Sequence, residues 1–255
     1  MKIRASQFLI VVAAVLLWEA GSRGGWLNPF FVSSPSRVAR VLAEWVGSGM
    51  VWRHLGMTMA EAGTGFALGL LTGIATGFWL AMCPRLDAVL QPFMVVGNAL
   101  PRISFAPLIV LWFGLGFTSK VVIVWSLVFF ISFFNTHRGF KEVSPVLLKN
   151  ARVLGATRWQ LLQQIYLPAS LAWTFASLRV SVGFAVTGAV LGEFIGSSGG
   201  IGYLIDNSQS NFDASGVMAG LAVLTGSVIL LDLLVKQVEQ RLCRWKSEED
   251  NEATL

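Results

Sequence analysis

The sequence predicts an all-α integral membrane protein with about six transmembrane helices. Hydrophobic residues make up 55% of the 255 residues and charged residues only 13%, whereas about a quarter of the residues in a soluble domain are charged. Residues 62–84 and 214–231 contain no charged side chain, and residues 88–136 contain only Arg102 and Lys120. About 20 mostly apolar residues can cross a bilayer as a helix, so the apolar surface of this chain is expected to face lipid.

The apolar runs place the crossings at residues 6–22, 58–82, 87–113, 118–136, 169–192 and 215–237. With the N-terminus in the cytoplasm, twelve Lys and Arg residues lie on the inner side and five on the outer side, which is the bias that sets membrane topology. We therefore expect a multi-pass protein of the bacterial inner membrane with both termini cytoplasmic. Residues 238–255 are then a cytoplasmic tail.

The positions of the basic residues and of the cysteines argue against nucleic-acid binding and against a disulfide. The net charge of +5 does not indicate nucleic-acid binding, because the basic residues lie between apolar runs and form no patch with interleaved aromatic residues. Cys83 and Cys243 both fall near the cytoplasmic face, where free thiols are expected in preference to a disulfide.

The N-terminal region, residues 1–54, starts like a secretory signal peptide. Lys2 and Arg4 precede an apolar run, but no small-x-small cleavage site follows it, so we expect a retained first crossing. The connection after it predicts a short amphipathic helix, capped by Ser34 or Ser36, that rests on the outer membrane surface. Its apolar face consists of Val38, Val41, Leu42 and Trp45.

The second and third crossings carry residues that are unusual in a lipid-facing helix. Glycines at 65, 69, 73 and 77 form one face that another helix can approach closely, and this helix can belong to the same chain or to a second copy. Pro101 and Pro107 favour a kink in the third crossing. Arg102 is costly in lipid, so it either packs on backbone carbonyls between helices or lines a water-filled pathway.

The loop over residues 137–168 is too polar to cross the membrane and predicts two short helices. Ser144 can cap the first helix, which starts with Pro145, and Gly155 suits the left-handed position that ends it. Thr157 and Gln160 have the spacing of a capping box for the second helix. Such a rigid, basic projection suits docking into a groove of another protein, although a helix pair lying on lipid headgroups is an alternative.

Pro168 is expected to begin the crossing that follows this loop. The loop resembles the EAA loop of binding-protein-dependent ABC permeases, in which EAA is followed by three residues, Gly, nine residues and Ile-x-Leu-Pro. The loop of this chain has every spacing of that motif, and Lys149 and Asn150 stand in place of its first Glu and Ala. The matching residues are Lys149, Asn150, Ala151, Gly155, Ile165, Leu167 and Pro168.

The resemblance covers residues 55–237. The segments ALPRISFAPLIVLWFGLG, ARVLGATRWQLLQQIYLPASL, SLRVSVG and GEFIGSSGGIGYLI look like the branch that serves uptake of nitrate, sulfonates, taurine and thiamine-pyrimidine precursors. The resemblance implies the fold of a type I ABC importer permease, with a permease core over residues 55–237. It also implies a translocation pathway for a small anionic or polar organic solute.

Several partners follow from the resemblance. It implies two ATPase chains, a second permease copy, a periplasmic binding protein and the bilayer; a homodimer is expected, with a heterodimer left open. The chain has no G-x-x-x-x-G-K-[ST] phosphate loop, so ATP and Mg are expected on the ATPase, with no cofactor, metal or catalytic residue in this chain. The residues that the resemblance assigns to ATPase coupling are Leu147, Ala151, Arg152, Leu154, Gly155, Ala156, Arg158, Ile165 and Pro168.

Polar residues inside the crossings are the candidates for the translocation pathway. Two arginines would suit an anionic solute, and they would equally suit structural pairing with Glu61, Glu193 or Asp232. The glycine-rich segment after Glu193 is either a re-entrant or outer loop near the gate or a flexible connection. The pathway candidates are Asn98, Arg102, Ser104, Arg179, Thr187 and Glu193.

Two other classes of transport protein compete with this interpretation. An ion-coupled secondary transporter would need carboxylates inside the membrane, but the acidic residues lie mostly near the ends of the crossings and no inverted repeat is evident. Composition alone also permits a channel. A membrane-embedded enzyme is disfavoured, because His54 and His137 are too far apart to suggest a metal cluster.

Overall fold

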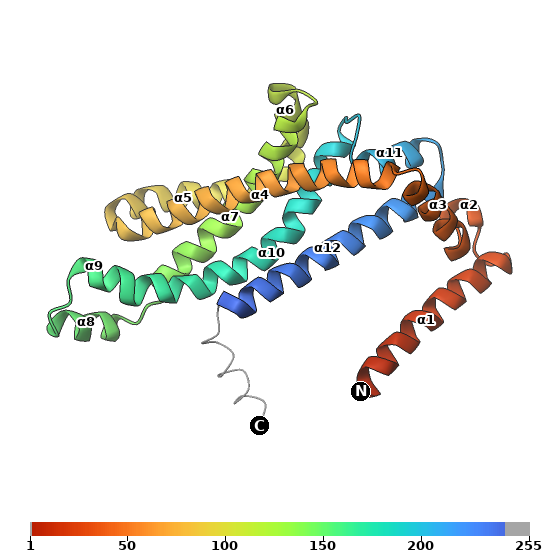
Figure 1. Cartoon of the computed structure of the whole chain (residues 1–255). Coiled ribbons are helices and arrows are strands. Elements are labelled where there is room, and N and C mark those ends of the chain that lie inside the picture. Colours follow the sequence, from red (N-terminus) through yellow and green to blue (C-terminus); the bar gives the residue numbers. More distant parts are fainter. Residues whose placement is uncertain (1, 243–255) are drawn as a thin grey trace.

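The computed structural model describes residues 2–242, and every regular element within that range is a helix. The bundle is built from α4 (Met50–Met82), α7 (Phe117–Lys141), α10 (Leu167–Phe194) and α12 (Ala214–Leu242), as Figure 1 shows. Four helical segments in the described part are long and apolar enough to cross a membrane, and a bent pair makes a fifth. The prediction of an all-α membrane protein is confirmed.

The N-terminal segment forms three helices beside this bundle (Figure 1). They are α1 (Lys2–Arg23), α2 (Pro29–Val32) and α3 (Pro35–Gly47). α1 is helical as expected, but it is not among the helices that are long and apolar enough to cross a membrane. The crossing expected at residues 6–22 therefore stays a prediction. The Glu19 carboxylate joins α1 to α3 by accepting the Ser36 N–H at 3.0 Å.

The apolar face of α3 packs on protein, where we expected it to rest on the membrane surface. Val38 is buried, and the Trp45 ring packs against a core cluster that contains Val51 of α4 and Leu224 of α12. The face is therefore covered by the bundle itself. Ser34 precedes α3 as predicted, but its side chain makes no capping hydrogen bond.

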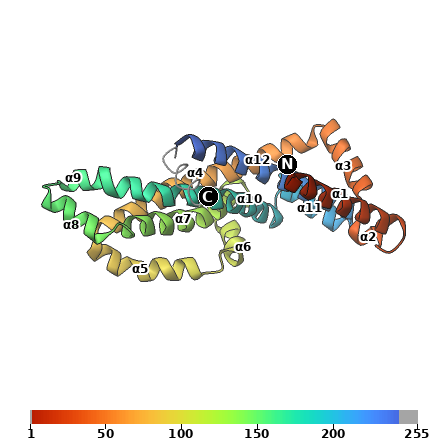
Figure 2. The same ribbon diagram turned by 90° about the horizontal axis from the view of Figure 1, so that it is seen from below.

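The predicted crossing at 87–113 is not one helix. It is divided into α5 (Pro84–Ala99) and α6 (Arg102–Phe113), which are bent by 91° at the break. Pro101 has no N–H to continue the helix and disfavours a helical conformation in the residue before it, and Leu100 is extended at φ −62° and ψ 135°. The break leaves α5 beside the bundle in Figure 2, with Phe93 and Val96 largely exposed.

The glycine ladder of α4 faces α7 of the same chain. A Cβ on Gly69 would lie 2.8 Å from Val128 Cβ, and one on Gly73 would lie 2.5 Å from the Phe129 carbonyl oxygen. A side chain at these positions would therefore push the helices apart. The sequence left the partner helix open, and the structure identifies it as α7.

The loop over residues 137–168 differs from its prediction at two residues. α8 (Pro145–Val153) starts after Ser144, whose side chain makes no capping hydrogen bond. α9 (Arg158–Leu161) runs through a π-turn, η1 (Leu162–Tyr166), directly into α10, so Pro168 lies within a continuous helix and does not begin one. The wider π-turn accommodates Pro168, which would otherwise clash with the carbonyl four residues before it.

Candidate functional site

The tip formed by α8 and α9 lies at the end of the molecule opposite α11 (Ile201–Ser210) (Figure 1). α8 ends in a Schellman motif: the Ala156 N–H donates to the Ala151 carbonyl at 3.0 Å, and the Gly155 N–H donates to the Arg152 carbonyl at 3.0 Å. Gly155 has φ +86°, a conformation that residues with a Cβ adopt only with strain. The predicted role of Gly155 in ending this helix is confirmed.

The predicted capping box begins α9. The Thr157 N–H donates to Gln160 Oε1 at 2.8 Å, and the Gln160 N–H donates to Thr157 Oγ1 at 3.3 Å. The Schellman motif ends at Ala156 and the capping box begins at Thr157, so the direction of the chain is fixed on both sides of the turn. The tip is therefore built as a stiff corner.

The tip exposes more apolar side chains than the sequence pattern indicated. α8 contains no buried residue, and Leu154 is 87% exposed, Val153 86% and Trp159 64%. Leu147 and Val146 are also exposed. Val146, Val153 and Trp159 are not among the coupling residues predicted from the sequence, and only their exposure in the fold reveals them.

An aromatic stack joins the base of the tip to α7, and ionic contacts join α7 to α5. The Tyr166 ring in η1 stacks on Phe140 of α7 with centroids 4.0 Å apart and planes at 4°. Near the same end of α7, buried Asp87 of α5 accepts from His137 Nε2 at 2.7 Å and pairs with Lys141. The base of the tip thus contacts α7, and α7 in turn is joined to α5. Ile165 is half-buried in this connection, and Pro168 is exposed.

The pathway candidates do not meet at one place. The Arg102 guanidinium lies at the α5–α6 break, donates to the Asn98 backbone carbonyl at 2.9 Å and sits 4.5 Å from the centre of the Phe130 ring. Ser104 is exposed on α6, and Thr187 is exposed on α10 with its hydroxyl bonded to the Gly183 carbonyl. Arg102 therefore has the contacts of a residue that stabilises the break.

Arg179 of α10 makes a two-pronged ion pair with Asp232 of α12. The Nε–Oδ1 and Nη2–Oδ2 distances are 2.8 and 3.1 Å. The side chains remain 48% and 38% exposed, on a helix pair that otherwise presents apolar side chains such as Val180 and Leu233. A half-exposed ion pair at membrane depth is costly against lipid, so this surface suits contact with another subunit or with water.

Glu193, at the end of α10, holds the N-terminus of α11. Its Oε2 accepts the Gly202 N–H at 2.6 Å, and its Oε1 accepts the Thr58 hydroxyl at 2.7 Å. The remaining first amides of α11 bond to α4, since the Ile201 N–H donates to Thr58 Oγ1 at 2.8 Å and the Gly200 N–H to His54 Nδ1 at 3.0 Å. A Cβ on Gly200 would overlap the carboxylate of Glu193, which explains the glycines after it.

Glu193→Ala is expected to loosen α11. The change leaves buried N–H and hydroxyl donors without an acceptor, at a cost of about 1–3 kcal/mol for each unsatisfied group. Hydrogen–deuterium exchange over 200–210 should accelerate by about tenfold or more for 2 kcal/mol. Asp206→Ala, which removes an exposed carboxylate from the same helix, should leave the exchange unchanged; equal exchange in both variants would contradict this role.

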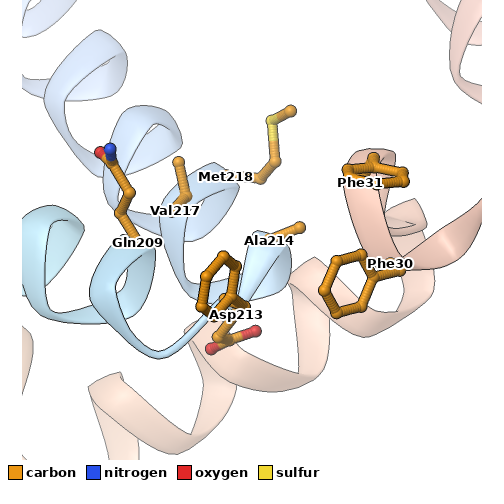
Figure 3. A pocket seen from close by; sticks show the side chains of 8 residues that line it. Phe30, Phe31, Gln209, Asp213, Ala214, Val217 and Met218 are labelled. Carbon is orange, nitrogen blue, oxygen red and sulfur yellow. The ribbon is translucent and has the colours of Figure 1, made fainter.

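A shallow aromatic pocket lies where α2 meets the turn between α11 and α12, with the rings of Phe30 and Phe31 facing that turn (Figure 3). Its volume is about 200 Å³. Its one carboxylate, Asp213, is engaged in accepting the Ser215 N–H at 3.0 Å. Exposed aromatic rings at one end of membrane-spanning helices fit the membrane–water interface, so this pocket gives no reason to assign a solute here.

Comparison with known proteins agrees with this architecture. Residues 69–244 match the family of binding-protein-dependent transport system inner membrane components. The chain is 34% identical over 233 residues to the riboflavin transport system permease protein RibX of Chloroflexus aurantiacus, with 91% of this chain and 87% of RibX covered. It is 28% identical to the taurine transport system permease protein TauC of Escherichia coli, with 92% and 88% covered.

A solved structure shares the fold. A chain of an amino acid ABC transporter solved with histidines superposes with a TM-score of 0.65 at 18% identity, covering 78% of this chain and 97% of that one. The family match covers most of the sequence, and the solved structure shares the helical fold of this chain. The chain belongs to the family of binding-protein-dependent transport system inner membrane components and is a permease subunit of an ABC importer.

Proposed function

We propose that a separate ATPase chain binds the tip over residues 142–161 and drives this permease between its inward-open and outward-open states. The observation that carries the proposal is the unpartnered apolar surface of a structurally stiff corner, with Leu154 87% exposed. Apolar side chains displayed on a short amphipathic helix are typical of docking into a groove. ATP and Mg are bound by the ATPase in this scheme, and this chain performs no hydrolysis.

Transmission of the ATPase movement follows from the contacts at the base of the tip. A push on α8 would reach α7 through the Tyr166–Phe140 stack and α10 through the continuous helix at η1. The coupling residues predicted from the sequence lie along this route, from Leu147 to Pro168. Arg152 is exposed on α8, where it can meet an acidic rim of the groove.

A second copy of the permease is the proposed neighbour in the membrane. Two surfaces support a homodimer: the half-exposed Arg179–Asp232 pair and the thinly covered α5, where Phe93 is 71% exposed. The ion pair suits a polar interface or a wet pathway between copies. The tip then faces the cytoplasm together with both termini, and α11 faces a periplasmic binding protein.

The proposed solute is a small anionic or polar organic molecule delivered by that binding protein. Relatives that are 34% and 28% identical to this chain are named for riboflavin and for taurine, so similarity to this chain does not by itself identify the solute. Selectivity therefore rests largely on the binding protein and on the outer surface of each permease.

Disulfide cross-linking tests the docking proposal. Leu154→Cys, in a chain whose native cysteines are replaced by serine, should cross-link to cysteines in the groove of the ATPase encoded with this permease. Trp26→Cys is the control, because Trp26 is 91% exposed near α2 on the side away from the tip. Cross-linking at Trp26 but not at Leu154 would overturn the proposed orientation, as would uptake that persists without the ATPase and collapses with the ion gradient.

A further inference from the structure

The helix α5 is attached to the rest of this chain by a charged side chain. Asp87, in its first turn, is the one buried residue of α5 and is only 3% exposed. Apolar residues of the same helix lie largely outside the fold, since Val89 is 61% exposed and Phe93 is 71% exposed. No apolar side chain of α5 is therefore buried against the bundle, beside which the helix runs in Figure 2.

Two side chains of α7 hold the Asp87 carboxylate. Its Oδ1 lies 2.7 Å from His137 Nε2, and its Oδ2 pairs with Lys141 Nζ, so both oxygens are engaged. Hydrogen bonds of this kind are directional, and separating a buried carboxylate from its partners leaves an uncompensated charge. The start of α5 is therefore tied to α7 more strictly than two apolar surfaces, which can slide over each other, would be.

The turn of α7 that holds Asp87 also receives the tip. Phe140 lies between His137 and Lys141 in the sequence, and its ring stacks on Tyr166 of η1 with centroids 4.0 Å apart. Residues 137–141 span about one helical turn, or roughly 6 Å along the axis. A displacement that the tip applies to this turn would therefore act on the Asp87 carboxylate at the same time.

The other end of α5 is placed against the same helix. A Cβ on Gly97 would lie 3.0 Å from Phe130 Cζ, so the backbone of α5 comes close to α7 there. Just beyond the break, the Arg102 guanidinium lies 4.5 Å from the centre of the same ring. Phe130 and His137 are about two turns apart on α7. Both points of attachment are thus on α7, which fixes the direction of α5 relative to that helix.

We propose that Asp87 is a positioning residue that makes α5 move with the end of α7 when the ATPase displaces the tip. The exposed face of α5, which supports the second permease copy, would then move relative to that copy and change the pathway between the two. The inference deepens the proposed function by naming the helix that follows the tip, and so rests on it.

Bimane fluorescence of the complete transporter in nanodiscs tests this role, with ATP and vanadate as the probe and the native cysteines replaced by serine. A label at Gln91→Cys reports on α5, and a label at Gln163→Cys reports on η1. Both side chains are exposed, and neither is assigned to coupling. We expect the trapped nucleotide to shift the emission of both labels.

Asp87→Asn removes the charge at nearly constant side-chain volume. It should abolish the shift at the α5 label and retain the shift at the η1 label, because the tip still moves but α5 no longer follows. A carboxylate that only stabilised the fold would affect both labels or neither. Glu44→Gln, a change at an exposed carboxylate on α3, is the control and should leave both shifts intact.

Lys141 supplies a second pair of variants, because its side chain is 49% exposed and its replacement spares the core. Lys141→Gln should reduce the shift at the α5 label relative to that at the η1 label, and Lys141→Arg, which keeps the charge, should restore it. If Asp87→Asn does not fold, these two variants decide by the same criterion.

The outcomes separate this inference from the proposed function. Absence of a shift at the η1 label in the parent transporter contradicts the proposed docking of the ATPase. A shift at the η1 label without one at the α5 label in the parent, or an α5 shift that survives in Asp87→Asn, contradicts the role of Asp87 and leaves the docking intact.

Discussion

Gly155→Val is expected to abolish ATP-driven uptake while the permease remains inserted in the membrane. A Cβ at this position meets no atom of this chain within 4 Å, so the effect does not come from a clash within the permease. The effect comes from the backbone conformation of Gly155, which has φ +86°. A β-branched residue is strained by about 1–3 kcal/mol in this conformation, so valine favours a conformation that turns the chain in a different direction after α8. Solute uptake in proteoliposomes containing the complete transporter should fall by about tenfold or more, with ATP hydrolysis retained.

Gly155→Asn is the matched control for this prediction. Asparagine tolerates the left-handed conformation better than other residues with a side chain, and the open space at Gly155 accommodates it. Uptake by the asparagine variant should therefore stay within about twofold of the original, because little strain is added. If the valine and asparagine variants transport equally well, the conformation at the tip does not govern coupling.

Gly73→Val is expected to prevent the bundle from assembling. The new Cβ would lie 2.5 Å from the Phe129 carbonyl oxygen and 2.8 Å from Ser132 Cβ, and the backbone oxygen cannot rotate away as a side chain can. Overpacking of this kind typically costs about 1–3 kcal/mol, and more when backbones must separate. The monodisperse peak of detergent-solubilised permease in size-exclusion chromatography should be lost or strongly reduced.

Gly63→Val provides the comparison on the same helix. Gly63 is exposed, and a Cβ there would meet nothing within 4 Å. The two variants add the same side chain to the same helix, so insertion and helix propensity are matched and only the approach of α7 differs. Aggregation of both variants would show that valine in α4, and not contact with α7, is the cause.

Much of the tip formed by α8 and α9 could be predicted from the sequence because its determinants are local. The residues that end α8 and begin α9 act on backbone groups within five positions of themselves, as the Ala156–Ala151 and Thr157–Gln160 hydrogen bonds show. Propensity and capping rules describe such short-range contacts directly. The same rules were wrong for two residues. The Ser144 side chain was predicted to cap α8, but a serine before a helix need not turn its hydroxyl to the backbone. Pro168 was predicted to begin a helix, but a π-turn can accommodate a proline within one.

The candidate site was harder to predict, since its contacts join residues far apart in the sequence. Glu193 was predicted to be a pathway residue from its position in the sequence, and its bonds to Thr58 and Gly202 show that its carboxylate also holds the start of α11. Thr58 lies 135 residues away, a separation at which no spacing rule operates. Glu61 was considered only as a possible partner for an arginine, and the structure places it beside Lys120 of α7 and Glu193 of α10.

The sequence by itself determined the membrane environment, the helical class and the corner at Gly155, because hydropathy and backbone conformation depend on nearby residues. Only the tertiary structure decided that the glycine ladder faces α7, that the third crossing bends by 91° and that Glu61 of α4 lies beside Lys120 of α7. Those features depend on which helices pack together, and packing is settled by close contacts among residues that the linear order leaves apart.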